Sequence, residues 1–404
     1  FFLCIYYKMG GGLMQLVAYG AQDIYLTGNP QITFFKVVYR RHTNFSTESI
    51  QQTWNGQDGT SANGRCTATI SRNGDLVSKM YLQIDSTGTT AEDNPGLWGI
   101  TDVTCEIGGQ QIDKHAGHYM EVRAELTEPN PYFVCAGVAP AAAAGSRGVG
   151  TLYQYMSASG GYAEGAVAST TVFVPLMFWF NRNPGLALPL IALQYHEVKI
   201  ILNHTFNTGF ATLSGQNLWC DYVYLDTDER RRFAQVSHEY LIEQVQHQTT
   251  AAALSSDLNF NHPVKEIIWT GAHTTTAGSQ ARAAVSTANW KLKLNGHDRM
   301  AARPTLYYTR QQVYDNHSGC GGIAADTGSS PDTAVKTTKC NDSIAVYSFA
   351  LKPEEHQPSG TCNFSRIDNA QLVQDGTAAA HEVYAINYNV LRIMSGMGGL
   401  AYSN

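Results

Sequence analysis

Short runs of β-branched and aromatic residues recur along most of the chain and are separated by glycine, asparagine and proline. Such runs, bounded by turn-forming residues, are typical of β-strands. Apolar periodicity of the helical kind, sustained for more than three turns, is hard to find. The pattern therefore predicts an all-β protein. Its clearest strands are expected at residues 66–70, 79–84, 103–107, 171–180, 198–202, 267–270, 345–351 and 383–393.

The two halves of the chain present similar motifs in the same order, which indicates an internal repeat. Gly109 in the first half corresponds to Gly296 in the second, 296 − 109 = 187 residues later. Phe178 corresponds in the same way to Phe349, 349 − 178 = 171 residues later. Each half has about 170 residues of strand and long loop, which fits an eight-stranded double-sheet jelly roll. The charged run DTDERRRF at 226–233 is interpreted as the linker between the halves.

Composition narrows the class of protein further. The chain has 404 residues, of which 43% are hydrophobic and only 15% charged, and its formal net charge is −6. Because no stripe of Lys and Arg accompanies that charge, direct nucleic-acid binding is disfavoured. The eight cysteines form no C-x-x-C pair and predict free, mostly buried thiols. The sequence contains no apolar stretch of about 18 residues, so no membrane span is expected.

Candidate catalytic and metal-binding residues do not converge on a site. His115 and His118 are interpreted as a surface pair, because no third ligand stands near them in the sequence. Neighbouring histidine and carboxylate residues occur at 196–197, 238–239 and 297–298, but neighbours in a strand point to opposite faces. The carboxylates of 226–229 are expected to pair with nearby arginines, namely Arg230, Arg231, Arg232 and Arg123. The sequence also lacks a phosphate-binding glycine loop and a nucleophile elbow. It therefore predicts no catalytic, cofactor or metal site and a protein that is not an enzyme.

Five N-x-[ST] triplets are possible glycosylation sites. Asn44 and Asn363 stand in strand-like contexts, where burial is expected to block access. The five asparagines are Asn44, Asn203, Asn316, Asn341 and Asn363.

Long ordered blocks of the sequence resemble one known family. They lie at residues 11–46, 183–199, 225–246, 357–370 and 387–404 and include GAQDIYLTGNPQITFFK, LDTDERRRFAQ and NYNVLRIMSGMGG. The chain closely resembles the major capsid protein of large nucleocytoplasmic DNA viruses, most nearly the form of chlorella-infecting phycodnaviruses. The resemblance extends from Met9 to Asn404, almost the whole chain.

The resemblance implies a double jelly roll and a structural role. Its expected parts are an N-terminal arm and extension (1–30), a first jelly roll (31–224), a linker (225–235) and a second jelly roll (236–404). The resemblance further implies homotrimers whose six jelly rolls form pseudo-hexagonal capsomers that tile an icosahedral capsid. Implied partners are other copies of the chain, neighbouring capsomers, minor capsid proteins and covalent glycans on outer loops. Implied locations are the virion capsid and, during assembly, the host cytoplasm.

The sequence departs from the family pattern in two respects. It starts eight residues before the usual Met-x-Gly-Gly beginning, and these residues are interpreted as a translated extension. Its outward loops at 274–287 and 321–338 are expected to be shorter than those of the family. A minor capsid paralog at special shell positions is therefore an alternative.

A second alternative is a jelly-roll carbohydrate-binding or attachment protein on the virion surface. Tyr153, Tyr155 and Tyr162 would support it if their rings were exposed for stacking on sugars. Core or trimer-contact positions are the favoured interpretation for these tyrosines. A metalloenzyme on the same fold would need clustered histidine and carboxylate ligands, which the sequence does not show.

Overall fold

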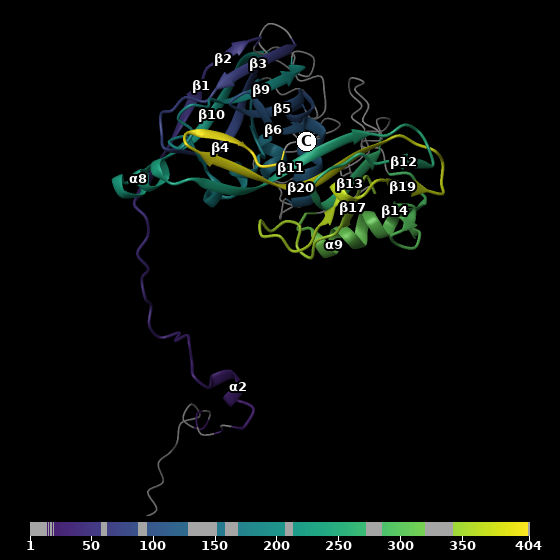
Figure 1. Ribbon diagram of the computed structural model, residues 1–404, viewed down its shortest axis with the longest axis horizontal. Helices are drawn as coiled ribbons and strands as arrows, with labels where there is room; N and C mark the ends of the chain where they lie inside the picture. The colour runs from purple at the N-terminus through teal and green to yellow at the C-terminus, as the bar shows by residue number, and fades with distance from the viewer. Residues whose placement is uncertain are drawn as a thin grey trace, which may run out of the picture. The chain divides into compact units, whose positions relative to one another are not determined.

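The computed structural model divides the chain into two units, Phe1–Asn44 and Phe45–Asn404 (Figure 1). The second, which contains the sheets, is called the compact unit below. The first unit contains the short helix α2 (Ile24–Thr27), and the N–H of Gly28 closes it by donating to the Ile24 carbonyl at 2.9 Å. The structure describes Met14, Leu16, Ala18 and residues 20–57, 63–87, 95–127, 152–157, 169–206, 213–271, 285–319 and 342–402. The predicted outward loop at 321–338 and most of the one at 274–287 lie outside the described residues.

Two antiparallel sheets form the first jelly roll. One sheet has the order β1-β10-β4-β7, with β8 on β4: β1 (Phe45–Gln52), β10 (Leu213–Leu225), β4 (Leu76–Thr87), β7 (Ser169–Pro175) and β8 (Leu188–Pro189). The other has the order β2-β3-β9-β5-β6: β2 (Trp54–Gly56), β3 (Gly64–Thr69), β9 (Val198–His204), β5 (Ile100–Ile107) and β6 (Gln110–Ala116). Along much of β10, buried positions alternate with more exposed ones, as expected of a strand with one face on a core.

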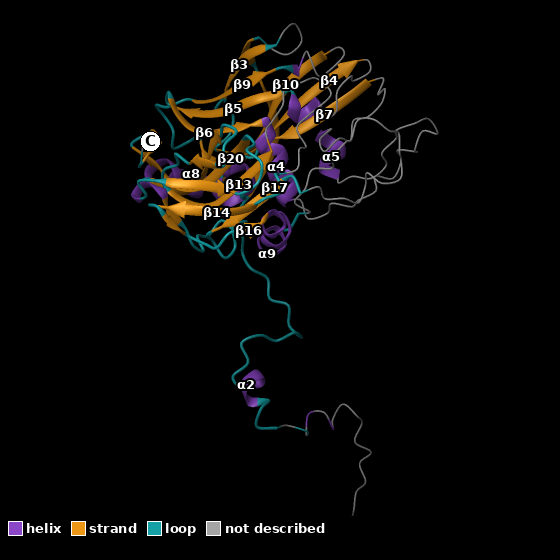
Figure 2. Cartoon of the chain, turned by 90° about the vertical axis from the view of Figure 1, so that its right-hand side faces the viewer, coloured by secondary structure: helices purple, strands orange, loops and turns teal. Residues whose placement is uncertain are grey.

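The second jelly roll repeats this architecture. Its first sheet has the order β11-β20-β13-β17, with β18 on β13 and β21 on β20: β11 (His238–Thr249), β20 (His381–Met394), β13 (Pro263–Gly271), β17 (Ile344–Ser348), β18 (Cys362–Asn363) and β21 (Met397–Leu400). Its second sheet has the order β12-β19-β14-β15, with β16 on β14: β12 (Ser255–Asp257), β19 (Ala370–Gln374), β14 (Asn289–Leu294), β15 (His297–Asp298) and β16 (Arg303–Pro304). Figure 2 shows the strands of both rolls in these layers.

The predicted internal repeat is visible in the strand order. The order β1-β10-β4-β7 corresponds strand by strand to β11-β20-β13-β17, and β3-β9-β5-β6 corresponds to β12-β19-β14-β15. The paired glycines occupy equivalent hairpins, between β5 and β6 and between β14 and β15. Both central residues of each hairpin have positive φ, at Gly108 (58°) and Gly109 (85°) and at Asn295 (51°) and Gly296 (78°). This is the geometry of a type I′ turn, which favours Gly and Asn-Gly.

Helices are short and connect the strands. They are α3 (Pro95–Trp98), α4 (Gly117–Thr127), α5 (Leu152–Ser157), α6 (Trp179–Arg182), α8 (Thr227–Gln235) and α9 (Gln312–Asn316), with single turns at Pro184–Leu186, Tyr307–Gln311 and Phe364–Arg366. The strand predicted at 171–180 ends earlier, at Pro175, because Phe178 leads into α6 instead. The linker prediction corresponds to α8, where the Asp226 carboxylate accepts a hydrogen bond from the Thr227 N–H at 2.8 Å. None of the helices in the described part of the chain has both the length and the apolar character needed to cross a membrane.

Two hydrophobic cores fill the rolls. The core of the first roll contains Phe178, Trp179 and Phe180, and Phe178 stacks on Phe180 with 5.9 Å between ring centroids. The core of the second roll is centred on Trp269 and Trp290, whose ring centroids are 5.7 Å apart. Four of the predicted free thiols lie in the described residues: Cys66, Cys105 and Cys220 are buried, and Cys362 is half-buried. Burial raises the pKa of the Cys105 and Cys220 thiols, so neither is a reactive thiolate.

Strand β20 contributes to three hydrophobic clusters. Val383 and Ala385 belong to the core of the second roll, whereas Leu391 and Ile393 belong to the core of the first. Tyr384, together with Ile386, belongs to a third cluster at the junction of the rolls. Strand β20 therefore packs in the cores of both rolls and in the cluster at their junction.

Candidate assembly site at the junction of the jelly rolls

The histidine pair noted in the sequence is not a surface pair. His115 is the last but one residue of β6 and is fully buried, with its Nε2 2.8 Å from Asp113 Oδ2 and its ring stacked on Phe178. His118 lies in α4, where its Nδ1 is 2.8 Å from the Tyr384 hydroxyl. The surface interpretation was wrong because His115 packs on Phe178 in the first roll, while His118 contacts Tyr384 of β20. Within the described ranges, no group of three His, Cys, Asp or Glu residues could hold a metal ion.

The neighbouring histidine and carboxylate residues take separate partners, as predicted for adjacent strand positions. His238 Nε2 contacts the Phe233 carbonyl at 2.8 Å, whereas Glu239 forms an ion pair with Arg392 at 2.7 Å. Asp298 likewise pairs with Lys291 at 3.0 Å and not with its neighbour His297. The pair at 196–197 precedes β9 and does not lie in a strand, but its members also have separate partners: His196 Nδ1 lies 2.9 Å from the Gly398 carbonyl, and Glu197 pairs with Lys199 at 3.6 Å.

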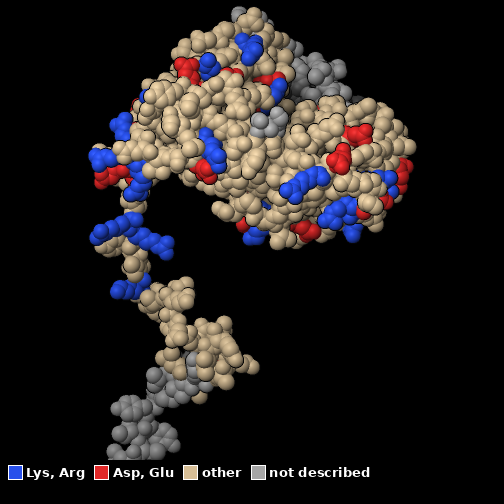
Figure 3. Space-filling view, in the orientation of Figure 1, with Lys and Arg blue, Asp and Glu red and all other residues tan. Residues whose placement is uncertain are grey.

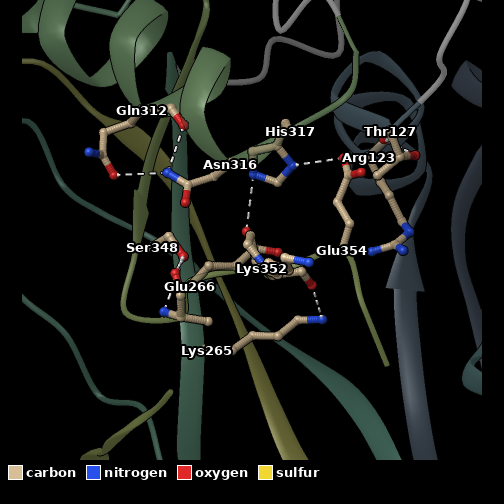
Figure 4. A network of polar contacts seen from close by, with 12 residues as sticks. Arg123, Thr127, Lys265, Glu266, Gln312, Asn316, His317, Ser348, Lys352 and Glu354 are labelled. Atoms are coloured by element: carbon tan, nitrogen blue, oxygen red, sulfur yellow. Dashed lines mark hydrogen bonds and ion pairs between the residues drawn. The ribbon is translucent and has the colours of Figure 1, made fainter. Parts of the chain in front are cut away.

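Charged residues of the linker helix α8 form ion pairs with nearby opposite charges. Glu229 pairs with Arg232 at 3.4 Å within α8, and Arg230 pairs with Asp75 of the first roll at 3.0 Å. Arg123, which we expected among these partners, instead lies in α4 close to Tyr119 and the carboxylates of the junction. Figure 4 shows it there.

Helix α4 of the first roll packs on the outer face of a sheet of the second. Its Tyr119, Val122 and Leu126 form the junction cluster with residues of β13, β17, β20 and α9. Those residues are Ile268, Ile344, Val346, Tyr384, Ile386 and Val313. Tyr119 and Tyr384 lie with their ring centroids 5.3 Å apart. A dry aromatic and aliphatic contact of this kind holds two domains in one orientation.

Hydrogen bonds between β6 and β11 reinforce the junction. The Asp113 carboxylate accepts a bond from the Val245 N–H at 3.1 Å, and the Gln244 side-chain amide donates to the Ile112 carbonyl. Asp113 therefore contacts His115 within its own roll and the main chain of the other roll.

A buried ionic network extends from this contact. Glu243 of β11 lies between two cations: Arg182 of α6 at 2.5 Å and Lys265 of β13 at 2.7 Å. Lys265 is only 1% exposed and also donates to the Pro353 carbonyl at 2.6 Å. Because an unpaired buried charge is costly, these three groups depend on one another.

Glu266, which follows Lys265 on β13, begins the second part of the ionic network. Glu266 contacts His317 Nε2 at 3.1 Å, and His317 Nδ1 lies 3.3 Å from Glu354 (Figure 4). The Ser318 N–H also donates to Glu354 at 2.9 Å, while the Ser318 hydroxyl donates to the Thr127 carbonyl at the end of α4. His317 thus connects a strand and a loop of the second roll next to the helix of the first.

The pKa shifts of Glu243 and His317 favour the charged forms of both groups, whereas burial lowers the pKa of Lys265. Burial alone would raise the pKa of Glu243, but Lys265 and Arg182 hold that pKa below its ordinary value. Burial alone would likewise lower the pKa of His317, yet Glu266 and Glu354 raise that pKa to about 9. His317 is therefore a cation at neutral pH. The network can lock the two rolls together, and its groups are already committed to internal partners.

Exposed apolar side chains gather at the tip of the hairpin β20–β21. Met394 and Met397 flank the turn, and the Tyr195 N–H donates to the Gly396 carbonyl at 3.0 Å. A Cβ on Gly396 would lie 2.6 Å from the Tyr195 ring, so close contact of ring and turn requires glycine there. Tyrosine and methionine are enriched in protein interfaces. Elsewhere on the visible face, side chains of both charges are interspersed (Figure 3).

The asparagines of the five triplets differ in access. Asn203 of β9 donates to Asp102 at 2.7 Å, and Asn316 of α9 donates to the Gln312 carbonyl at 2.8 Å. Asn44 and Asn363 are exposed, so their expected burial was wrong: one precedes β1, and the other lies in the two-residue strand β18. Asn341 lies outside the described residues.

Two consecutive jelly rolls of one topology, joined through a buried junction, define a double jelly-roll protein. The family model "Major capsid protein N-terminus" matches residues 33–226, and the model "Large eukaryotic DNA virus major capsid protein" matches residues 229–399. The chain belongs to the major capsid protein family of large eukaryotic DNA viruses.

Individual relatives support this assignment. A major capsid protein of Pyramimonas orientalis virus is 52% identical, over 98% of this chain and 100% of the relative. The major capsid protein of Paramecium bursaria Chlorella virus 1 is 40% identical with the same coverage. A quasi-atomic capsid structure of that chlorella virus matches with a TM-score of 0.73 and 35% identity, over 92% of this chain and 100% of the solved chain. The Faustovirus major capsid protein, at 13% identity and a TM-score of 0.67, shares the fold.

The chain is therefore a structural subunit of a virus capsid, and the carbohydrate-binding alternative is not favoured. The structure also places Tyr153, one of the three tyrosines considered for sugar stacking, in the core of the first roll. The side chain of Tyr155 and all of Tyr162 lie outside the described residues.

Proposed function

We propose that the chain forms homotrimers, in which six jelly rolls build a pseudo-hexagonal capsomer that tiles an icosahedral shell. The observation that carries this proposal is the matching strand order of the two rolls. Three copies would supply six similar jelly rolls, one for each side of a hexagonal outline. The buried junction supports it as well, because a tile must keep its two rolls in one orientation. Shape and area suffice for this role, so we further propose that the chain is not an enzyme.

The native mass of the purified chain tests the trimer. We expect light scattering to give a mass near three times 44.1 kDa that persists on dilution. A clean monomer at all concentrations would contradict the trimer and favour a role at special shell positions.

The proposed domain organisation is an arm (1–30), a first roll (31–224), a linker (225–235) and a second roll (236–404). The two family models support a division near α8, since one ends at 226 and the other begins at 229. The first strand of the compact unit begins later than residue 31, at Phe45.

We propose that neighbouring capsomers and minor capsid proteins are the further partners, that assembly takes place in the host cytoplasm, and that the chain does not contact nucleic acid directly.

The arm at Gly10–Asn29 is the part proposed to order against these partners at the capsomer base. Deleting residues 9–29 is expected to leave trimers intact, because the deletion lies outside the compact unit. Shell assembly should be weakened, as measured by particle yield in electron micrographs. A normal yield of closed shells would contradict this role of the arm.

We propose covalent glycans on exposed asparagines. If the N-x-[ST] triplets are used, Asn44 and Asn363 are expected to be modified, because both side chains are exposed. Asn203 provides the internal control, since Asp102 holds its amide within a sheet. Peptide mass mapping of protein from virions measures the occupancy of each site. A glycan on Asn203, with Asn44 and Asn363 bare, would contradict the assignment.

A further inference from the structure

Residues 32–39, which we call the apolar segment, expose an unusual amount of hydrophobic surface. Phe34, Phe35 and Val37 are 87%, 98% and 97% exposed. The other large apolar side chains of the segment are also exposed: Ile32, Val38 and Tyr39. Soluble proteins rarely present so many adjacent apolar side chains unless a partner covers them.

The pattern within the apolar segment indicates what kind of partner fits. The segment contains no helix and is rich in β-branched and aromatic residues, which favour extended structure. In an extended chain, Ile32, Phe34 and Val38 lie on one face and Phe35, Val37 and Tyr39 on the other. Apart from Lys36 on the first face and Thr33 on the second, both faces are then apolar, as in a strand that is buried on both sides. An element lying on a lipid surface would instead keep one polar face toward water. The segment is therefore suited to a protein partner that encloses it.

Charge indicates which protein surface is complementary. Residues 1–44 contain four basic residues and one acidic residue, a formal charge of 4 − 1 = +3. The compact unit therefore has a formal charge of −6 − 3 = −9. Lys36, Arg40 and Arg41 lie within or directly after the apolar segment. Opposite charges favour the encounter of this segment with a compact unit of the same chain.

The compact unit also offers an open strand edge. Among the described strands, β1 pairs only with β10 and forms the edge of its sheet. A sheet edge presents unpaired N–H and C=O groups that can bind an added strand. Backbone hydrogen bonds along such an edge would fix the register, while the apolar side chains supply buried area.

We propose that the apolar segment of one copy is covered by the compact unit of a second copy and forms an intersubunit strand. The inference rests on the proposed function, because it requires copies of the chain to assemble. It adds a specific contact to that proposal: residues 32–39 become part of the interface between copies.

Site-specific crosslinking tests the contact in isolated trimers of the full-length protein, without neighbouring capsomers or minor capsid proteins. A photoreactive phenylalanine replaces Phe35, and the matched control places the same group at Leu26, an exposed residue of α2. We expect irradiation at position 35 to give a covalent dimer on a denaturing gel, with crosslinked peptides from residues 45–404. The yield should exceed that from position 26 at least about tenfold. Trimers that crosslink only within one chain would overturn the inference and leave the proposed trimer standing.

Substitution provides the second measurement. The variant Phe34→Ser/Phe35→Ser/Val37→Ser is compared with Tyr25→Ser/Leu26→Ser, which removes exposed apolar side chains of the same unit. We expect the triple variant to dissociate at a concentration at least about tenfold higher than the control. Its unfolding temperature should stay unchanged after dissociation, because the altered residues lie outside the compact unit.

Three other results would overturn the inference. Equal dissociation of both variants, with the wild-type chain trimeric, would remove the contact but keep the trimer. Co-flotation of the wild-type chain with anionic vesicles, lost in the triple variant while its native mass is unchanged, would reassign the segment to lipid. A monomeric wild-type chain would overturn this inference and the proposed function together.

Discussion

Replacing Glu243 with glutamine is expected to lower the free energy of unfolding by about 3–5 kcal/mol, the range typical of breaking a buried ion pair. The substitution keeps the shape of the side chain but removes the negative charge that pairs with both Arg182 and Lys265. Lys265 is buried, so its ammonium group cannot regain hydration without opening the junction. Urea denaturation of the compact unit, followed by tryptophan fluorescence, measures the change.

Glu239 provides a matched control on the same strand. It pairs with Arg392, but the two side chains are 59% and 53% exposed, so Glu239→Gln should cost less than about 1 kcal/mol. Equal effects of the two substitutions would show that the Glu243 network adds nothing beyond a surface pair. A large effect of Glu243→Gln alone would locate the stability in the junction.

Raising the pH from about 6.5 to above 9 is expected to remove about 3 kcal/mol of stability through His317 alone. The pKa of His317 is raised in the folded protein to about 9, against about 6.5 in an unfolded chain. A raised pKa means that the folded state holds the proton more tightly. The contribution is therefore complete below about pH 6.5 and disappears as the pH rises through about 9. Unfolding free energies measured between pH 6 and pH 10 provide the test.

The variant His317→Gln separates this effect from other titrations. It cannot carry a proton in this range, so the difference between wild type and variant should be about 3 kcal/mol at pH 6 and close to zero at pH 10. His297→Gln serves as control, because His297 is exposed in β15. A difference between wild type and His317→Gln that does not change with pH would mean that His317 is neutral in the folded protein.

The sequence predicted the strands well because strand signals are local. Alternation and turn residues lie within a few positions of one another, so β3, β4, β5 and β9 were located to within about three residues. The hairpin glycines were also recognisable, because a type I′ turn needs positive φ at two adjacent residues. The strand at 171–180 was drawn too long because Phe178 and Phe180 have strand propensity but pack in the core around α6.

Helix α4 was missed for a physical reason. Eight of its eleven residues are buried, including Glu121 and Glu125, so the helix has no polar face and no amphipathic period. Its position between β6 and a long connection gave no capping signal either. A helix packed between two domains cannot be recognised from a one-sided pattern, because both of its sides are covered.

The ionic network was missed because its members are far apart in the sequence. Arg182, Glu243, Lys265 and His317 come from different elements, and tertiary folding alone brings them together. One local signal was present. Lys265 and Glu266 interrupt an otherwise apolar strand, and charges in a buried strand require partners.

The route of β20 has a consequence for how the protein is made. Residues 391 and 393 complete the core of the first roll, yet they are translated after almost all of the second roll. The first roll therefore cannot finish folding while the ribosome is still adding the second, in contrast to chains whose N-terminal domains fold as they emerge. A nascent chain would hold an open first roll until residues 381–394 arrive. Subunits stopped short of this strand would lack part of both cores, so only fully translated chains can become competent building blocks.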